Sequence, residues 1–97
     1  MRLDRYLFFI RLVKSRTLAQ ALIEQGHIRI DGRRVTKSSW DIAVGQVFSL
    51  PLRGQVRVLR VTALPSRRGP ASEARAYYEE LGETPDSANV SQQGTAD

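Results

Sequence analysis

Apolar residues recur with a helical period at the start of the chain. The i, i+3, i+4, i+7 spacing that builds one buried helix face is followed by Leu3, Tyr6, Leu7, Ile10 and Val13. The sequence therefore predicts a helix over residues 3–13. Phe8 and Leu12 lie on the other side of this helix, so they need a second cover within the fold or they form a contact surface.

A second helix is predicted between two residues that favour helix ends. Ser15 is a good N-cap residue, and Gly26 is a good residue to follow a helix. One face of this helix carries Leu18, Ala21, Leu22 and Gln25. Because only Lys14 and Ser15 separate the two predicted helices, we expect them to pack as a tight corner.

From His27 onward the hydrophobic period changes from helical to alternating. Ile28 and Ile30 alternate with polar residues, and Asp31-Gly32 is a favoured two-residue hairpin turn. Glycine at the second turn position is expected at positive φ. The segment 33–35 then forms the returning strand.

Two further β-rich stretches follow at residues 47–50 and 55–64. The alternation of the second stretch slips at Val58-Leu59, which predicts a β-bulge there. Residues 71–81 are predicted to form a short acidic helix. Its apolar face, which we expect to cover Phe8 and Leu12, carries Ala74, Tyr77, Tyr78 and Leu81.

The order of elements predicts an α+β fold in which a two-helix corner packs on a small, mostly antiparallel sheet, with an added C-terminal helix. We expect residues 1–64 to form the domain and residues 65–82 to form a linker and an amphipathic helix. Residues 83–97 have almost no apolar side chains and are predicted to be a disordered tail.

Charge is distributed unevenly along the chain. Residues 1–70 carry 14 Lys and Arg against four acids, a net charge of +10, whereas residues 71–97 carry one cation against six acids, a net charge of −5. All cations except Lys14 and Lys37 are arginines. The planar guanidinium suits phosphates and base edges, so this usage favours nucleic acid as the partner.

Several function classes have little support. The chain has no cysteine and one histidine, His27, and it has no glycine-rich phosphate loop. We therefore expect neither an enzyme nor a metal or other cofactor. The apolar run at residues 6–10 is too short for a signal peptide and no stretch approaches a membrane span, so the predicted location is the cytoplasm, with no membrane partner.

The basic residues of the predicted corner and hairpin form the candidate site. If the hairpin folds back beside the helices, the cations surround one concave surface able to contact phosphates. They are Arg2, Arg5, Arg11, Lys14, Arg16, Arg29, Arg33, Arg34 and Lys37.

The spaced motifs within residues 2–50 resemble the S4 RNA-binding domain, which is named after small-subunit ribosomal protein four. The matching segments are Arg2-Leu3-Asp4-Arg5-Tyr6-Leu7, Lys14-Ser15-Arg16, residues 19–23, Gly26-His27-Ile28 and residues 31–35. Residues 67–74 and Tyr78-Glu79-Glu80 are similar to the segment that follows this domain in the ribosome-associated heat shock protein 15 family.

This resemblance implies the S4 fold, also called the alpha-L motif, and a role on the large ribosomal subunit with nascent chains stalled on transfer RNA. It implies large-subunit ribosomal RNA as the partner, with transfer RNA as a second candidate. RNA contacts are implied for Arg2, Arg5, Lys14, Ser15, Arg16, Arg33, Arg34 and Lys37, and we add Arg29. Gln20 is included as a weaker contact, because relatives often carry a cation there.

Two other functions remain open at this point. A protein-interaction adaptor would use Phe8, Leu12 and the acidic C-terminal helix to recruit a partner. A DNA-binding module is less favoured, because no recognition helix is predicted after the second helix. We expect a monomer that reads the shape of folded RNA, since A-form helices hide their base edges in a deep groove.

Overall fold

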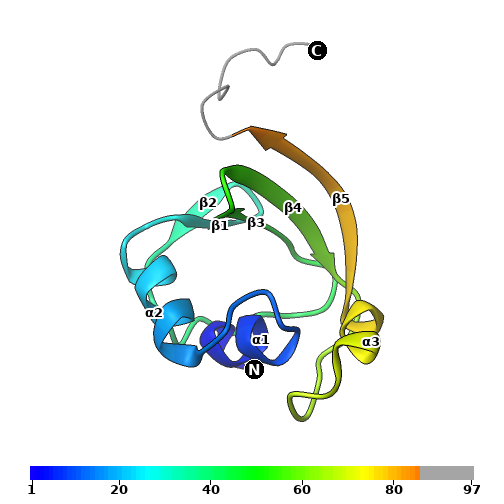
Figure 1. Cartoon of the computed structure of the whole chain (residues 1–97). Coiled ribbons are helices and arrows are strands. Elements are labelled where there is room, and N and C mark those ends of the chain that lie inside the picture. Colours follow the sequence, from blue (N-terminus) through cyan, green and yellow to red (C-terminus); the bar gives the residue numbers. More distant parts are fainter. Residues whose placement is uncertain (86–97) are drawn as a thin grey trace.

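Two helices beneath a curved antiparallel sheet make up the fold of the computed structural model, which describes residues 1–85 (Figure 1). The helical elements are α1 (Leu3–Phe9), α2 (Arg16–Glu24), α3 (Ala71–Ala74) and the 3-10 turn η1 (Arg75–Tyr77). The strands are β1 (Ile28–Ile30), β2 (Arg33–Val35), β3 (Val47–Leu52), β4 (Gln55–Val61) and β5 (Tyr78–Pro85). The predicted α+β class, with two N-terminal helices and an antiparallel sheet, is confirmed.

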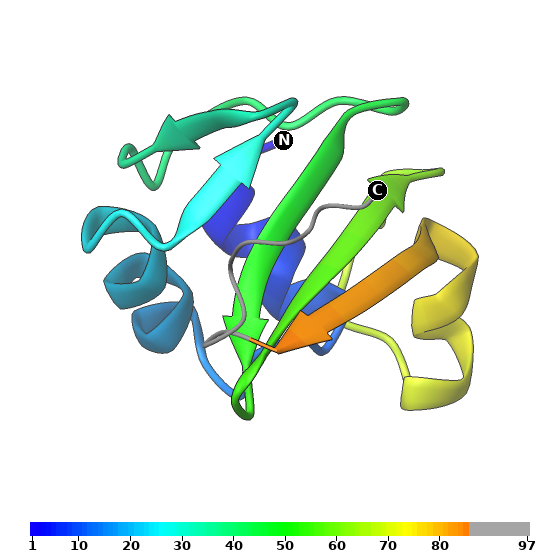
Figure 2. The same ribbon diagram turned by 90° about the horizontal axis from the view of Figure 1, so that it is seen from above.

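The sheet has the order β2-β1-β3-β4-β5, and every neighbouring pair is antiparallel. Helix α1 lies beneath the middle of the sheet, α2 lies near β1, and α3 lies at the opposite side beside the start of β5 (Figure 2). Side chains from the helices and from one sheet face form a single core. Within it, the rings of Tyr6 and Phe48 meet edge to face, with centroids 5.7 Å apart.

The predicted apolar stripe of α1 is buried along its whole length, but the helix itself ends earlier than the predicted end at Val13. Arg11 has φ of +64°, which stops the helix. The backbone N–H groups of Arg11 and Leu12 donate to the carbonyls of Phe8 and Leu7 at 3.1 and 3.2 Å. These are the two bonds of a Schellman motif, in which an arginine stands where glycine is usual.

Helix α2 begins and ends at the residues that its sequence predicts. The Ser15 hydroxyl oxygen accepts a hydrogen bond from the backbone N–H of Leu18 at 3.1 Å. Gly26 has φ of +83°, and its N–H and that of His27 close a second Schellman motif. The core takes Ala19 and Ile23 of this helix, whereas Leu18 is 49% exposed.

The first hairpin has the predicted two-residue turn. Ile30 pairs with Arg33, and Asp31 and Gly32 between them have φ of +50° and +83°. Positive φ at both positions is the mark of a type I′ turn, which matches the twist of the flanking strands. Asp31 also accepts a hydrogen bond from the backbone N–H of Val47 at 2.9 Å, which ties the turn to β3.

The predicted C-terminal helix is wrong beyond its first turn. After the four residues of α3 and the turn η1, the chain forms β5, which pairs with β4 along its length. The free edge of β4 supplies backbone partners that no local helix pattern can reveal, and Arg60 and Arg57 of β4 pair with Glu79 and Glu80 of β5. Residues 83–85, predicted as part of the tail, belong to β5, and residues 86–97 lie outside the described residues.

The predicted irregularity at Val58-Leu59 is present in the pairing with β5. Val58 pairs with Gly82 and Leu59 pairs with Glu80, so Leu81 is the additional residue. Pairing between β3 and β4 runs without interruption. The bulge therefore lies in the partner strand, at the position where the alternation of β4 slips.

Phe8 and Leu12 are half buried, and the helix predicted to cover them ends at Ala74. The guanidinium of Arg68 lies 4.5 Å from the centre of the Phe8 ring and donates to the Phe8 carbonyl at 3.0 Å. This arginine caps the end of α1 and covers its aromatic side chain at once. The segment between β4 and α3 thus takes over the role predicted for a helix.

Candidate nucleic-acid interface

A buried carboxylate organises the basic residues at the helix corner. Asp4 in α1 has no exposed surface. Arg2 donates two hydrogen bonds to it at 3.0 Å each, and Arg16 and Gln20 of α2 donate at 3.3 and 2.9 Å. We call these four residues the Asp4 cluster.

The hydrogen bonds of the cluster fix the ionisation of Asp4. Burial raises the pKa of this carboxyl, but the bonds from Arg2, Gln20, Arg16 and the backbone N–H of Arg5 outweigh burial and hold its pKa well below its usual range. Asp4 in turn raises the pKa of Arg2 by hydrogen bonding and by its charge. The carboxylate is therefore charged at any physiological pH.

The cluster still presents positive charge to solvent. The side chains of Arg2 and Arg16 are 46% and 43% exposed, whereas Asp4 is buried beneath them. Each guanidinium has more N–H donors than its contact with Asp4 uses. Two oriented arginines over one hidden carboxylate form a pre-organised surface for a phosphate group.

Gln20 and Ser15 have structural roles within this surface. The Gln20 amide donates to Asp4, so its main contact is inside the protein, where the sequence suggested a contact with RNA. The hydroxyl of Ser15 serves as the N-cap of α2. Lys14 beside it is exposed.

Two arginines of the first hairpin lie on the same face of the sheet. Arg29 and Arg34 stand directly opposite each other in β1 and β2. Because Ile28 and Ile30 face the core, Arg29 points to the sheet face that lies away from the helices. Arg34 shares this face, because directly paired residues of neighbouring strands point to the same side of a sheet.

Arg34 reaches back toward the end of α2. A Cβ added at Gly26 would lie 3.2 Å from its Cδ, so the arginine side chain crosses the C-terminus of the helix, where a cation is favoured. Arg34 also lines a hollow of about 240 Å³ at the end of the hairpin. The lining residues of this hollow are Arg33, Arg34, Val35, Thr36, Lys37 and Trp40.

The segment that follows the hairpin connects this hollow to the Asp4 cluster. The backbone N–H groups of Leu3 and Asp4 donate to the carbonyls of Trp40 and Ser38 at 2.8 and 3.2 Å. The Ser38 hydroxyl donates to Glu24 of α2 at 2.9 Å. Residues 37–40 therefore bind to the first turn of α1 and to α2, which fixes the hairpin cations beside the helix corner.

Arg5 lies in α1 and is exposed. Its guanidinium carbon lies 5.4 Å from the centre of the Phe9 ring. This contact restrains the arginine without neutralising it. The structure thus brings together Arg2 and Arg16 on one side and Arg33, Arg34 and Lys37 on the other, with Arg5 and Lys14 at the helix corner.

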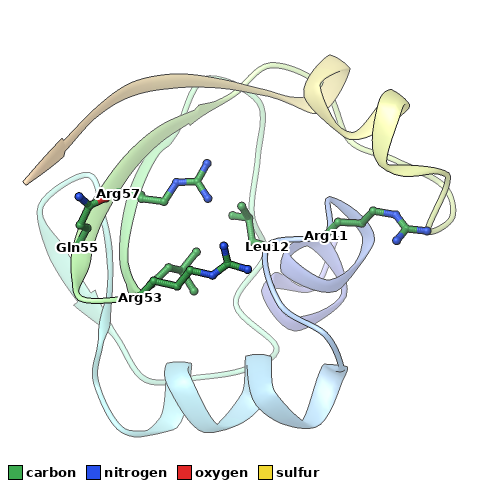
Figure 3. A pocket seen from close by; sticks show the side chains of 6 residues that line it. Arg11, Leu12, Arg53, Gln55 and Arg57 are labelled. Carbon is green, nitrogen blue, oxygen red and sulfur yellow. The ribbon is translucent and has the colours of Figure 1, made fainter.

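A second basic site was missed by the sequence reasoning. Arg53 and Arg57 point into the space beside Leu12, whereas Arg11 points away toward the segment after β4 (Figure 3). The Nε of Arg11 donates to the Gly69 carbonyl at 2.7 Å. The signal available in the sequence was the Arg53-Gly54 pair, which resembles the Asp31-Gly32 turn. In the structure, Arg53 and Gly54 have φ of +55° and +79°.

Arg57 is partly neutralised in this second site. Its guanidinium donates to both carboxylate oxygens of Glu80, and this hydrogen bonding raises the pKa of Arg57.

Within residues 1–85, no helix has the length and apolar character to cross a membrane. The same residues hold no group of three His, Cys, Asp or Glu side chains placed to bind a metal ion.

Comparison with known proteins identifies the class of this interface. Residues 1–48 match the family described as the S4 domain, and these residues include α1, α2 and the first hairpin. Small ribosomal subunit protein uS4 of Lacticaseibacillus casei is 43% identical over 54 residues, which are 56% of this chain and 27% of that protein. The protein carries an S4 domain over residues 1–48.

The similarity to one S4 protein extends beyond that domain. Heat shock protein 15 of Escherichia coli K12 is 36% identical over 84 residues, which are 87% of this chain and 62% of that protein. A trimeric structure of heat shock protein 15 from Vibrio cholerae superimposes with a TM-score of 0.80 at 28% identity, covering 84% of this chain and 82% of the other. The chain is an S4-domain protein homologous to the heat shock protein 15 family, and it spans 62% of the length of the Escherichia coli protein.

Proposed function

We propose that this protein docks on structured ribosomal RNA of the large ribosomal subunit and acts in the rescue of stalled nascent-chain complexes. The observation that carries this proposal is the Asp4 cluster, because it holds Arg2 and Arg16 in fixed positions beside the hairpin cations. The homology to heat shock protein 15 supports the ribosome as the place of action. Transfer RNA is a second candidate contact on the same subunit.

The mechanism is electrostatic docking onto folded RNA. Oriented guanidinium groups bind phosphates bidentately, and a rigid surface of such groups reads the backbone geometry of an A-form helix. The proposed contacts are Arg2, Arg5, Lys14, Arg16, Arg33, Arg34 and Lys37. Each neutralised phosphate should steepen the salt dependence of binding by roughly 0.7 to 0.9 in log–log slope.

Co-sedimentation tests the proposal directly. Tagged protein is mixed with separated ribosomal subunits and with large subunits that carry peptidyl-transfer RNA, and the gradients are probed for the tag. We expect it in the large-subunit fraction, with more protein bound when peptidyl-transfer RNA is present. Arg75→Ala, an exposed arginine outside the proposed surface, is the matched control for Arg16→Ala. Equal binding to both subunits would contradict the proposal.

The alternative functions lose support from the structure. The adaptor hypothesis needs a C-terminal helix over residues 71–81, but that segment has only the short helix α3 and the turn η1 before strand β5. Arg68 also covers Phe8. The DNA-binding hypothesis needs a recognition helix after α2, but α2 is followed by strand β1. RNA binding therefore remains the function that the site supports best.

The sequence predicts a monomer, whereas the Vibrio cholerae relative was solved as a trimer. The trimeric relative counts against the predicted monomer. Light scattering across a concentration series measures the mass of this chain in solution.

A further inference from the structure

Trp40 is the single tryptophan of the chain, and it lies at the edge of the proposed RNA surface. Its side chain is half buried and forms a wall shared by two hollows of about 240 and 390 Å³. Lys37 lines both hollows, and Arg33 and Arg34 line the first. One indole ring is thus bordered by three cations of the proposed interface.

The indole N–H of Trp40 is buried and has no hydrogen-bond partner within residues 1–85. A buried donor without a partner costs free energy that a phenylalanine at the same position would avoid. The Trp40 ring packs against the core, but its indole N–H adds a hydrogen-bonding cost that this packing does not require. Local penalties of this kind are expected at positions that serve a ligand.

The backbone holds Trp40 in place for such a role. Its N–H donates to the Lys37 carbonyl at 3.0 Å, and its carbonyl accepts from Leu3 at the start of α1 at 2.8 Å. The backbone of Trp40 is consequently fixed relative to both the hairpin and the first turn of α1. A ligand that meets the ring also meets Lys37, which lines both hollows.

We propose that Trp40 stacks on an unpaired base of the bound RNA while Lys37 and Arg33 hold the phosphates on either side of that nucleotide. The proposal rests on the proposed RNA-binding function and adds a site for one single-stranded nucleotide. An aromatic face accepts any base, and cations beside it match the backbone of the same strand. The surface thereby combines a docking site for paired RNA with a contact to a loop or bulge.

Intrinsic fluorescence tests the proposal, because all tryptophan emission comes from Trp40. Two RNA probes are compared: a stem with an unpaired loop, and a blunt duplex with the sequence of the same stem. Binding of each is measured independently by the anisotropy of a label on the RNA. We expect the stem–loop to quench Trp40 and to protect it from acrylamide, and the duplex to bind without either effect.

Substitutions separate stacking from a structural role. Trp40→Leu removes the aromatic face and should weaken stem–loop binding about tenfold, with duplex binding unchanged. Trp40→Phe keeps the face and removes the orphan N–H, so it should lose less than about threefold and melt at or above the wild-type temperature. Tyr77→Leu removes a half-buried aromatic side chain that lines neither hollow, and it is the matched control.

The outcomes distinguish this site from the proposed function. If neither RNA binds the wild-type protein, the proposed function is wrong and the stacking site is wrong with it. If both RNAs bind but Trp40 emission stays constant, only the stacking site is wrong. Equal losses of duplex and stem–loop binding in folded Trp40→Leu would also overturn it, because that result assigns Trp40 to the surface for paired RNA.

Discussion

Arg16, at the first position of α2, donates a hydrogen bond to the buried carboxylate of Asp4 in α1 across 3.3 Å. The contact joins the two helices of the corner, and it fixes a cation that we assign to RNA binding. Stability and function therefore depend on the same ionised group.

Replacing the carboxylate should destabilise the fold. Asp4→Asn leaves Arg2 and Arg16 without their anion, although both are partly hydrated already. We expect a loss of about 2–4 kcal/mol in the free energy of unfolding, because the removed charge is buried but its partners are half exposed. Urea unfolding measures it. Glu73→Gln, which removes an exposed carboxylate 3.7 Å from Arg67, should change stability by less than about 0.5 kcal/mol.

The lowered pKa of Asp4 predicts that the free energy of unfolding decreases in acid. Because the pKa of Asp4 is lower in the folded than in the unfolded chain, its contribution is fully present above the unfolded pKa of about 4. This contribution is lost as pH falls below that value toward the folded pKa. Urea midpoints between pH 7 and pH 2 should decline more for the wild type than for Asp4→Asn. Parallel declines would show that Asp4 titrates normally.

RNA affinity should depend on both groups of cations. Replacing both Arg16 and Arg34 by alanine removes one guanidinium from the helix-corner cations and one from the hairpin cations. We expect a loss of about 2–4 kcal/mol in binding free energy. The salt dependence should become shallower at the same time. Filter binding with a ribosomal RNA fragment measures both effects. Unchanged affinity in a variant with unchanged circular dichroism would remove this surface from the proposal.

Features set by local chemistry could be predicted from the sequence. The Ser15 cap, the Gly26 terminus of α2 and the Asp31-Gly32 turn each depend on a few neighbouring residues, and all three are present. The buried stripe of α1 was likewise visible from its spacing. The end of α1 was not, because Arg11 adopts positive φ without the glycine that usually marks it.

Features set by distant partners could not be predicted from spacing. The sequence predicts residues 78–81 as the end of a helix and residues 83–85 as part of a tail, but the open edge of β4 pairs with residues 78–85 as a strand. The Asp4 cluster joins side chains from two helices, and Gln20 and Arg16 meet Asp4 only after those helices cross. The candidate site predicted from the sequence therefore lacks Asp4, although Asp4 is the centre of the cluster.

Gly32 provides a test of the hairpin geometry. A Cβ at this position would meet nothing within 4 Å, so the cost of a substitution comes from φ of +83° alone. Gly32→Val should destabilise by about 1 kcal/mol or more and weaken RNA binding by displacing Arg33 and Arg34. Gly82→Val, at a glycine with equally open surroundings and ordinary φ, is the matched control. Equal melting temperatures for the two variants would contradict the turn assignment.

The acidic start of β5 should restrict where RNA binds. Glu79 and Glu80 pair with Arg60 and Arg57 of β4, and these pairs lower the positive charge of the sheet edge while the Asp4 cluster stays positive. Replacing both acids with glutamine keeps the side-chain size and removes two negative charges, so attraction to any phosphate backbone should increase.

We therefore expect Glu79→Gln with Glu80→Gln to bind single-stranded polyuridine several-fold more tightly at low salt, with a steeper salt slope by roughly 0.7 for each arginine that gains a phosphate. Affinity for the ribosomal RNA fragment should rise less, so the ratio of specific to nonspecific binding should fall. Glu73→Gln is the control for a lost surface charge elsewhere. A double variant that binds both RNAs as the wild type does would show that β5 has only a structural role at this edge, where each exposed ion pair contributes roughly 0–1 kcal/mol.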